Sequence, residues 1–148
     1  MSDKIVLQLF KEMGQREVHT ISEDATALDA ARMMRAKNIG ALAVVNEKVD
    51  LVGIVSERDV NNKVAALNKL SVEVQVSEIM TKKVAVVFLT TNLKECEETM
   101  KDLHVRHLIV MDKGKLVGIV SIRDLLVSTR EELEDIVRHL KHYIGIPG

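Results

Sequence analysis

Two copies of one short motif place a hydroxyl and a carboxylate three residues apart. The segments 51–60 and 116–125 are identical at eight of ten positions, at an offset of 65. In each copy an apolar strand ends in a serine, and the aspartate falls in the first turn of the helix expected to follow. These residues are Ser56 and Asp59 in the first copy and Ser121 and Asp124 in the second. The repeat indicates a duplicated unit with two sites of one kind.

The chemistry of this motif has two interpretations. In the structural one, the serine caps the helix and the aspartate stabilises the positive end of its dipole. In the functional one, the carboxylate accepts hydrogen bonds from the vicinal hydroxyls of a ribose, each contributing roughly 1.5–3 kcal/mol. The helix start suits a phosphate, which Arg58 and Arg123 could grip in bidentate fashion. Gly53 leaves room for a flat group to approach the backbone. Both interpretations stay open from the residues alone.

The elements around the motif repeat as well, in the order strand, helix, strand, strand, helix. Each first helix starts with a capping side chain three residues before an acid. The two strands that follow are so close in sequence that they should pair as an antiparallel hairpin. The expected segments are 18–21, 26–37, 39–45, 51–56 and 57–67 in the first copy, and 84–87, 92–103, 105–111, 116–121 and 122 onward in the second.

The fold class is therefore mixed α/β (α+β), with two pseudo-symmetric units packed together and an extra helix at each end. A helix pair and a small sheet cannot bury their apolar faces alone, so the units should pack on each other. We expect an N-terminal helix over 1–14, repeat units over 15–70 and 71–128, and a C-terminal helix and tail over 129–148.

An apolar stripe runs along the last of these segments, with acids before bases, as the helix dipole favours. It either covers the duplicated body or forms a subunit interface. Its members are Leu133, Ile136, Val137, Leu140 and Ile144.

Composition excludes several classes of function. The 21 basic and 22 acidic residues nearly cancel, and only three residues are aromatic, so neither a nucleic acid nor an anionic membrane is an expected partner. The start of the chain resembles no signal peptide, no apolar run suits a membrane span, and the single Cys96 fits a reducing compartment, so we expect a cytoplasmic protein. The five histidines lack zinc-site spacing, and no phosphate-binding glycine loop is present.

The repeated unit resembles the CBS domain (cystathionine β-synthase-type), and the tandem resembles a Bateman module of the small stand-alone bacterial type. Two copies of Gly-hydrophobic-x-Ser-x-x-Asp, each after a β-α-β stretch, carry the resemblance over residues 17–127. The resemblance implies a central cleft in which each serine and aspartate hold the ribose and phosphate of an adenosine compound. The adenine would lie against backbone of the other copy's first strand.

Carried over by position, the resemblance implies two unequal ligand sites. One combines Ser56 and Asp59 with Lys83, Ala85, Val105 and His107. The other combines Ser121 and Asp124 with Val18, His19, Ile39, Gly40 and Arg106. The expected binding set also includes Arg58, Ile119 and Arg123. Because these arginines suit phosphate, nucleotides should be favoured over S-adenosylmethionine.

The leading hypothesis is a regulatory, nucleotide-sensing homodimer that binds AMP, ADP or ATP, or NAD(H), and catalyses nothing. No cofactor or metal is expected, and the hypothesis allows for a regulated partner protein that the sequence does not identify. A second hypothesis is a structural or adaptor homodimer with vestigial sites, in which serine and aspartate are caps only. A third is an enzyme, supported only by relatives that sit inside enzymes such as inosine monophosphate dehydrogenase.

Overall fold

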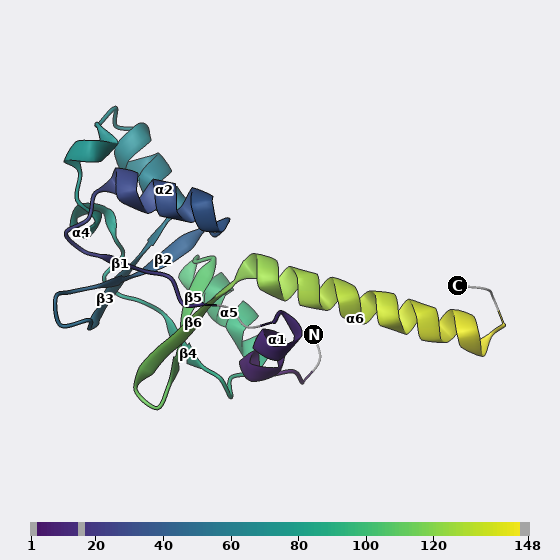
Figure 1. Ribbon diagram of the computed structural model, residues 1–148. Helices are drawn as coiled ribbons and strands as arrows, with labels where there is room; N and C mark the ends of the chain where they lie inside the picture. The colour runs from purple at the N-terminus through teal and green to yellow at the C-terminus, as the bar shows by residue number, and fades with distance from the viewer. Residues whose placement is uncertain (1–2, 15–16, 146–148) are drawn as a thin grey trace. The chain divides into compact units, whose positions relative to one another are not determined.

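The computed structural model describes residues 3–14 and 17–145 (Figure 1). The helices are α1 (Val6–Glu12), α2 (Ala27–Lys37), α3 (Glu57–Val60), α4 (Val76–Ile79), α5 (Leu93–Leu103) and α6 (Ile122–Tyr143), with a π-helical turn η1 (Asn61–Ala65) and a 3-10 turn η2 (Ser71–Glu73). The strands are β1 (Thr20–Ser22), β2 (Ala41–Val45), β3 (Leu51–Ser56), β4 (Val86–Phe88), β5 (His107–Asp112) and β6 (Lys115–Ser121). This composition confirms the mixed α+β class.

The strands form two three-stranded sheets, ordered β1-β2-β3 and β4-β5-β6. In the first sheet β1 pairs parallel with β2, and β2 pairs antiparallel with β3, with Ala41 opposite Ser56. The hairpin expected between 39–45 and 51–56 is therefore confirmed. Its register places Ser56 at the end of β3, where the chain turns directly into α3.

The chain folds into two compact units that do not follow the repeat boundaries. Of the described residues, the first unit comprises 3–14, 87–108 and 120–145, and the second comprises 17–86 and 109–119. The segment after residue 70, expected to open the second repeat, packs on the first one: Ala27 N donates to Val74 O at 2.7 Å, and Val76 N donates to Ala25 O at 2.8 Å.

The core of the second unit forms around α2. Thr26 caps this helix by accepting from Asp29 N, while the Asp29 carboxylate accepts from Thr26 N at 3.0 Å. These backbone and side-chain hydrogen bonds to Thr26 lower the pKa of Asp29. The helix ends at Asn38 in the left-handed conformation, and its inner face is buried: Ala27, Ala30 and Met34.

In the first unit, α5 repeats the plan of α2. Asn92 accepts from Glu95 N at 2.8 Å to cap the helix, which ends at left-handed His104. Cys96 stands where α2 has Ala30, and it is fully buried. Burial raises the pKa of the Cys96 thiol to about 11, which fits a core residue rather than a nucleophile.

Helix α1 belongs to the same unit and contacts the loop before α5. Val6 N donates to Thr91 O and Leu93 N donates to Lys4 O, both at 2.9 Å. Val6 and Leu9 are buried, and Gly14 follows the helix with a positive φ of 79°, as expected for a helix stop.

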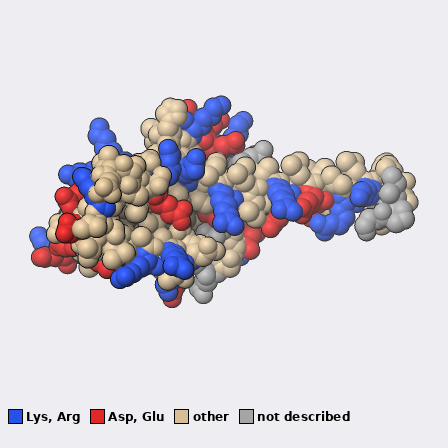
Figure 2. All heavy atoms as spheres, turned by 90° about the horizontal axis from the view of Figure 1, so that it is seen from above, with Lys and Arg blue, Asp and Glu red and all other residues tan. Residues whose placement is uncertain are grey.

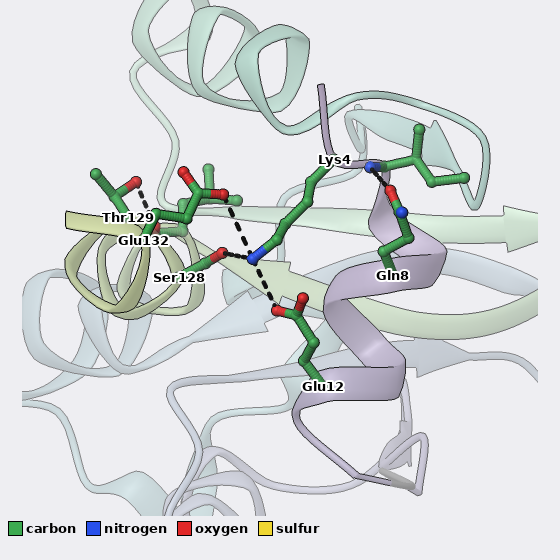
Figure 3. Close-up of polar contacts among 8 residues, drawn as sticks. Lys4, Gln8, Glu12, Ser128, Thr129 and Glu132 are labelled. Atoms are coloured by element: carbon green, nitrogen blue, oxygen red, sulfur yellow. Dashed lines mark hydrogen bonds and ion pairs between the residues drawn. The ribbon is translucent and has the colours of Figure 1, made fainter. Parts of the chain in front are cut away.

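Lys4 ties α1 to α6 (Figure 3). Its Nζ lies 3.0 Å from Glu12 Oε2, 3.4 Å from Glu132 Oε1 and 3.3 Å from the hydroxyl of Ser128. Burial lowers the pKa of Lys4, but the hydrogen bonds and charges of Glu12 and Glu132 outweigh it, so the net shift is upward.

Two helices differ from the sequence-based expectation. The helix expected over 57–67 is α-helical only to Val60 and continues as a π-turn, in which Ala66 N donates to Asn61 O at 2.8 Å. Helix α6 is continuous from Ile122 to Tyr143, so the boundary expected after residue 128 falls inside a helix. Among the described residues, no helix is both long enough and apolar enough to cross a bilayer.

Candidate ligand-binding site

The first Ser-x-x-Asp turn lies where β3 passes into α3. Ser56 N donates to Asp59 Oδ2 at 2.9 Å, and Asp59 N donates in return to Ser56 Oγ at 3.3 Å. The Ser56 hydroxyl also lies 3.2 Å from Asp59 Oδ2. The serine and the aspartate thus hold each other in a capping box, which fixes the carboxylate at the end of the strand.

The second turn repeats this geometry where β6 passes into α6. Ser121 N donates to Asp124 Oδ2 at 2.9 Å, and Asp124 N donates to Ser121 Oγ at 3.1 Å. Asp124 is buried, with 6% of its surface exposed. The pseudo-symmetry read from the sequence therefore extends to the side-chain hydrogen bonds.

The structure confirms that both serines and both aspartates cap helices. The same reciprocal bonds join Thr26 and Asp29 at α2, away from the repeated motif. The capping geometry by itself thus also occurs outside the repeated motif and does not select a ligand site.

A lysine that the sequence-based interpretation did not include contacts the first turn. Lys63 Nζ lies 3.0 Å from Asp59 Oδ1 and donates to Ile79 O at 2.8 Å. The two oxygens of Asp59 thus have different partners, the backbone on Oδ2 and an ammonium on Oδ1. The sequence signal that could have predicted this contact is the i,i+4 spacing of Asp59 and Lys63, an acid and a base on one expected helix.

The two turns differ at the position of this lysine. At the offset of 65, Lys63 corresponds to Ser128, which is buried and accepts from Lys4. A pocket of the first unit lies at this place, and its lining includes both Asp124 and Ser128. The full lining is Leu9, Glu12, Met13, Asp124, Val127, Ser128 and Glu131. The groups around the two aspartates therefore differ, while unequal ligand binding by the two sites stays a prediction.

The expectation for Gly53 needs a correction. A Cβ atom there would lie 2.8 Å from both Met80 Sδ and the carbonyl oxygen of Thr81. The same segment bonds to β3, since Ile54 N donates to Thr81 O and Thr81 N donates to Ile54 O. The group that approaches the backbone of Gly53 is therefore the chain's own segment 80–81, not a flat ligand.

Backbone bonds place two further candidates beside the turns. Gly40 O accepts from Glu57 N at 3.0 Å, and Arg106 O accepts from Ile122 N at 2.8 Å. Arg106 therefore lies at the start of α6, beside Ser121, with which it was grouped. Gly40 lies at the start of α3, beside Ser56, although it was grouped with Ser121.

The remaining candidates lie along the strands and their leading segments. The cationic ones are exposed: Arg58, Lys83 and Arg123. The others are partly buried: Val18, His19, Ile39, Ala85, Val105, His107 and Ile119. The backbone carbonyls of His19 and Ala85 accept from Ala43 N and Ile109 N, respectively. Their role in binding a ligand stays a prediction. No group of three or more His, Cys, Asp or Glu suited to a metal ion occurs within residues 3–14 and 17–145.

Comparison with known proteins finds relatives both by sequence and by structure. An uncharacterized protein of Methanopyrus kandleri is 40% identical over 128 residues, which span 82% of this chain and 65% of that protein. A putative signal-transduction protein with CBS domains from Burkholderia ambifaria superposes with a TM-score of 0.81 at 39% identity, over 85% of this chain and 93% of the other.

Two more solved structures bear on ligand and assembly. A CBS domain protein of Pyrobaculum aerophilum complexed with AMP matches with a TM-score of 0.70 at 27% identity, over 82% of this chain and 89% of that one. A hexameric CBS-CP12 protein from bloom-forming cyanobacteria matches with a TM-score of 0.72 at 32% identity, over 78% and 68% of the two chains.

The family comparison agrees with the duplicated motif, the two β-α-β-β-α repeats and the two capped turns. The CBS domain matches twice, at residues 10–66 and 76–131, and together these matches cover most of the chain. The chain therefore belongs to the CBS domain family and carries two CBS domains in tandem.

Proposed function

We propose that this chain is a regulatory module that binds adenine nucleotides through its two Ser-x-x-Asp turns and catalyses no reaction. The observation that carries the proposal is the repeated fixing of a carboxylate at a strand end, by Ser56 for Asp59 and by Ser121 for Asp124. A carboxylate held in place by backbone bonds loses little freedom when it accepts from a ribose. The AMP complex of the Pyrobaculum aerophilum relative supports this class of ligand.

Each turn also carries a cation suited to phosphate. Arg58 and Arg123 occupy matching positions, and both are exposed. A guanidinium can bind phosphate oxygens through two parallel hydrogen bonds. We therefore propose AMP, ADP, ATP or NAD(H) as ligands ahead of S-adenosylmethionine, which has no phosphate.

Lys63 adds a positive charge to the first turn, beside the carboxylate of Asp59. A ribose hydroxyl that donates to Asp59 Oδ1 shares this oxygen with Lys63 Nζ, while Oδ2 keeps its bond to Ser56 N. The second turn has Ser128 instead of this lysine. The two turns should therefore bind nucleotide with different affinities.

The regulatory mechanism in this proposal is a population shift. A nucleotide that binds one conformation of the module better than another increases the population of that conformation, and a partner protein responds to it. Assembly into a homo-oligomer and a cytoplasmic location belong to the same proposal. The hexameric CBS-CP12 relative supports assembly as a property found among such proteins.

The experiment is thermal unfolding with AMP, ADP, ATP, NAD and S-adenosylmethionine in turn. A ligand at 100 times its dissociation constant should add about 2.7 kcal/mol to the free energy of unfolding, which raises the melting temperature by several degrees. Asp59→Asn combined with Asp124→Asn should abolish this rise, because an amide is a weaker acceptor for ribose hydroxyls than a carboxylate.

Asp29→Asn is the matched control, because Asp29 makes the same capping bonds outside the repeated motif. Asp29→Asn should lower the stability of its helix about as much as each motif substitution lowers that of its own helix. It should leave the nucleotide-induced rise in melting temperature intact. A rise that survives in the double variant would overturn the assignment of these carboxylates to ribose.

The adaptor hypothesis remains the second candidate, because the capping bonds of Asp29 match those of the two motif aspartates. If none of the five compounds raises the melting temperature of the unaltered protein, the turns are caps only. That result would favour an adaptor with vestigial sites.

A further inference from the structure

The C-terminal half of α6 carries an apolar face that nothing within its own unit covers. Leu133, Ile136, Val137, Leu140 and Ile144 have exposed fractions between 49% and 63%, and Tyr143 is 88% exposed. In Figure 1 this half of the helix extends beyond α1 and α5, the other helices of its unit. Six large apolar side chains on a little over three helical turns form a surface suited to another helix.

The spacing of these residues is that of a helix seam. Leu133, Val137, Leu140 and Ile144 follow one another at intervals of four, three and four residues. This is the alternation by which two helices pack side by side in a coiled coil. Ile136 and Tyr143 widen the seam along one edge.

Charge along the same half of α6 reverses from acidic to basic. Glu131, Glu132, Glu134 and Asp135 come before Val137, and Arg138 and Lys141 come after it. Figure 2 shows charged side chains of both signs on this helix, beside a stretch of uncharged surface. Of these charges, Glu134 and Lys141 flank the seam. Antiparallel alignment of two copies brings Glu134 of each beside Lys141 of the other, whereas parallel alignment does not.

We propose that two copies of this chain associate through antiparallel pairing of their α6 helices over residues 133–144. In this register Val137 of each copy packs against Leu140 of the other, and Leu133 packs against Ile144. The flanking positions then bring Glu134 of each copy beside Lys141 of the other, on both sides of the two-fold axis. The proposal concerns assembly alone and does not depend on nucleotide binding.

The Glu134–Lys141 pairing is specific to this arrangement. In a parallel pair the position opposite Glu134 would be Thr129, and Lys141 would face Ile136. Within one chain Glu134 pairs with Arg130, and its own side chain is 56% exposed. The carboxylate of Glu134 thus stays at the surface, where a lysine of a second copy can reach it.

The test is the molar mass in solution, measured by sedimentation equilibrium over a hundredfold range of protein concentration. The unaltered chain should approach twice its mass of 16.5 kDa as concentration rises. Glu134→Lys alone and Lys141→Glu alone should each weaken association at least tenfold, because each places two like-charged pairs across the seam. The double variant should restore association.

A mixture of the two single variants should form heterodimers, since position 134 of one then meets an opposite charge at position 141 of the other. Glu131→Lys is the matched control: it makes the same change in charge on the same helix but outside the seam, and should leave association unchanged. Circular dichroism should show that each variant keeps its helix content.

Two results would overturn the proposal. One is an unaltered chain that stays monomeric throughout the concentration range. The other is a dimer that resists both single reversals, or whose weakening is not restored in the double variant or the mixture.

Discussion

At the scale of single residues, each motif aspartate is held by its own backbone through one carboxylate oxygen. Oδ2 accepts from Ser56 N in the first turn and from Ser121 N in the second, at 2.9 Å in both. In the first turn the other oxygen faces Lys63. A side chain restrained in this way stabilises the helix start and, in our proposal, is also preorganised to accept from a ligand.

A glycine in the repeated motif allows close packing of the chain on itself. Gly53→Ala should lower the free energy of unfolding by about 1–3 kcal/mol, because its Cβ would lie 2.8 Å from the Thr81 carbonyl. Urea denaturation measures the loss. Gly114→Asn is the control, since a Cβ there would meet nothing within 4 Å and asparagine tolerates the positive φ. Equal stability of Gly53→Ala and the unaltered protein would contradict the packing described for segment 80–81.

The buried thiol predicts a loss of stability at alkaline pH. The folded-state pKa of Cys96 is about 11, above the ordinary 9.0. The contribution of the neutral thiol to the free energy of unfolding is therefore complete below pH 9 and declines as the pH rises towards 11. The slope is about 1.4 kcal/mol per pH unit. Cys96→Ala, which installs the residue that α2 has at position 30, should remove this part of the pH dependence.

Urea unfolding of both proteins at pH 8, 9 and 10 checks the effect of Cys96. At pH 8 the difference in free energy of unfolding between the unaltered protein and Cys96→Ala reflects the lost packing of the sulfur. This difference should shrink as the pH rises, because only the unaltered protein loses stability when the thiol ionises. A difference that stays constant to pH 10 would show that the thiol ionises equally easily in the folded and unfolded chain.

At the scale of elements, the sequence predicted where most helices and strands begin and end. Capping pairs such as Thr26 with Asp29 are local signals, and α2 and α5 start and stop where these signals place them. The π-turn after Val60 and the continuity of α6 through residue 128 depend on backbone hydrogen bonding beyond the first turn. Local residue patterns do not specify these features.

The candidate site was predictable to a similar extent. The repeated serine and aspartate were apparent from sequence, and their capping geometry was one of the two interpretations considered. Contacts between distant residues were not apparent: Thr81 with Gly53, Ile79 with Lys63, and Lys4 with Ser128. Such contacts arise from packing of separate segments, which no periodicity in the chain encodes.

The attachment of α1 can be tested through Lys4. Lys4→Met should cost about 1–2 kcal/mol of stability, because it keeps the aliphatic stem but removes the bonds to Glu12, Glu132 and the buried Ser128 (Figure 3). Hydrogen exchange should also quicken at the amides of α1 relative to those of α5. Lys11→Met, at an exposed lysine of the same helix, is the control. Unchanged exchange in Lys4→Met would show that apolar packing alone holds α1.

At the scale of the whole molecule, duplication gives two turns with one chemistry and different surroundings. Asp59 has Lys63 beside it, whereas Asp124 lies in a pocket that it shares with Ser128. If both turns bind nucleotide, as we propose, the module would respond to two ranges of nucleotide concentration. The reversed charges along α6 offer, independently, a means of self-association.

The most direct measurement of the central claim is a crystal structure of the protein with AMP. The account predicts AMP with its ribose 2′- and 3′-hydroxyls within hydrogen-bond distance of the carboxylate of Asp59, of Asp124, or of both. Contradiction would come from both carboxylates bonded only to their own chain while AMP is absent or is held elsewhere through its ribose.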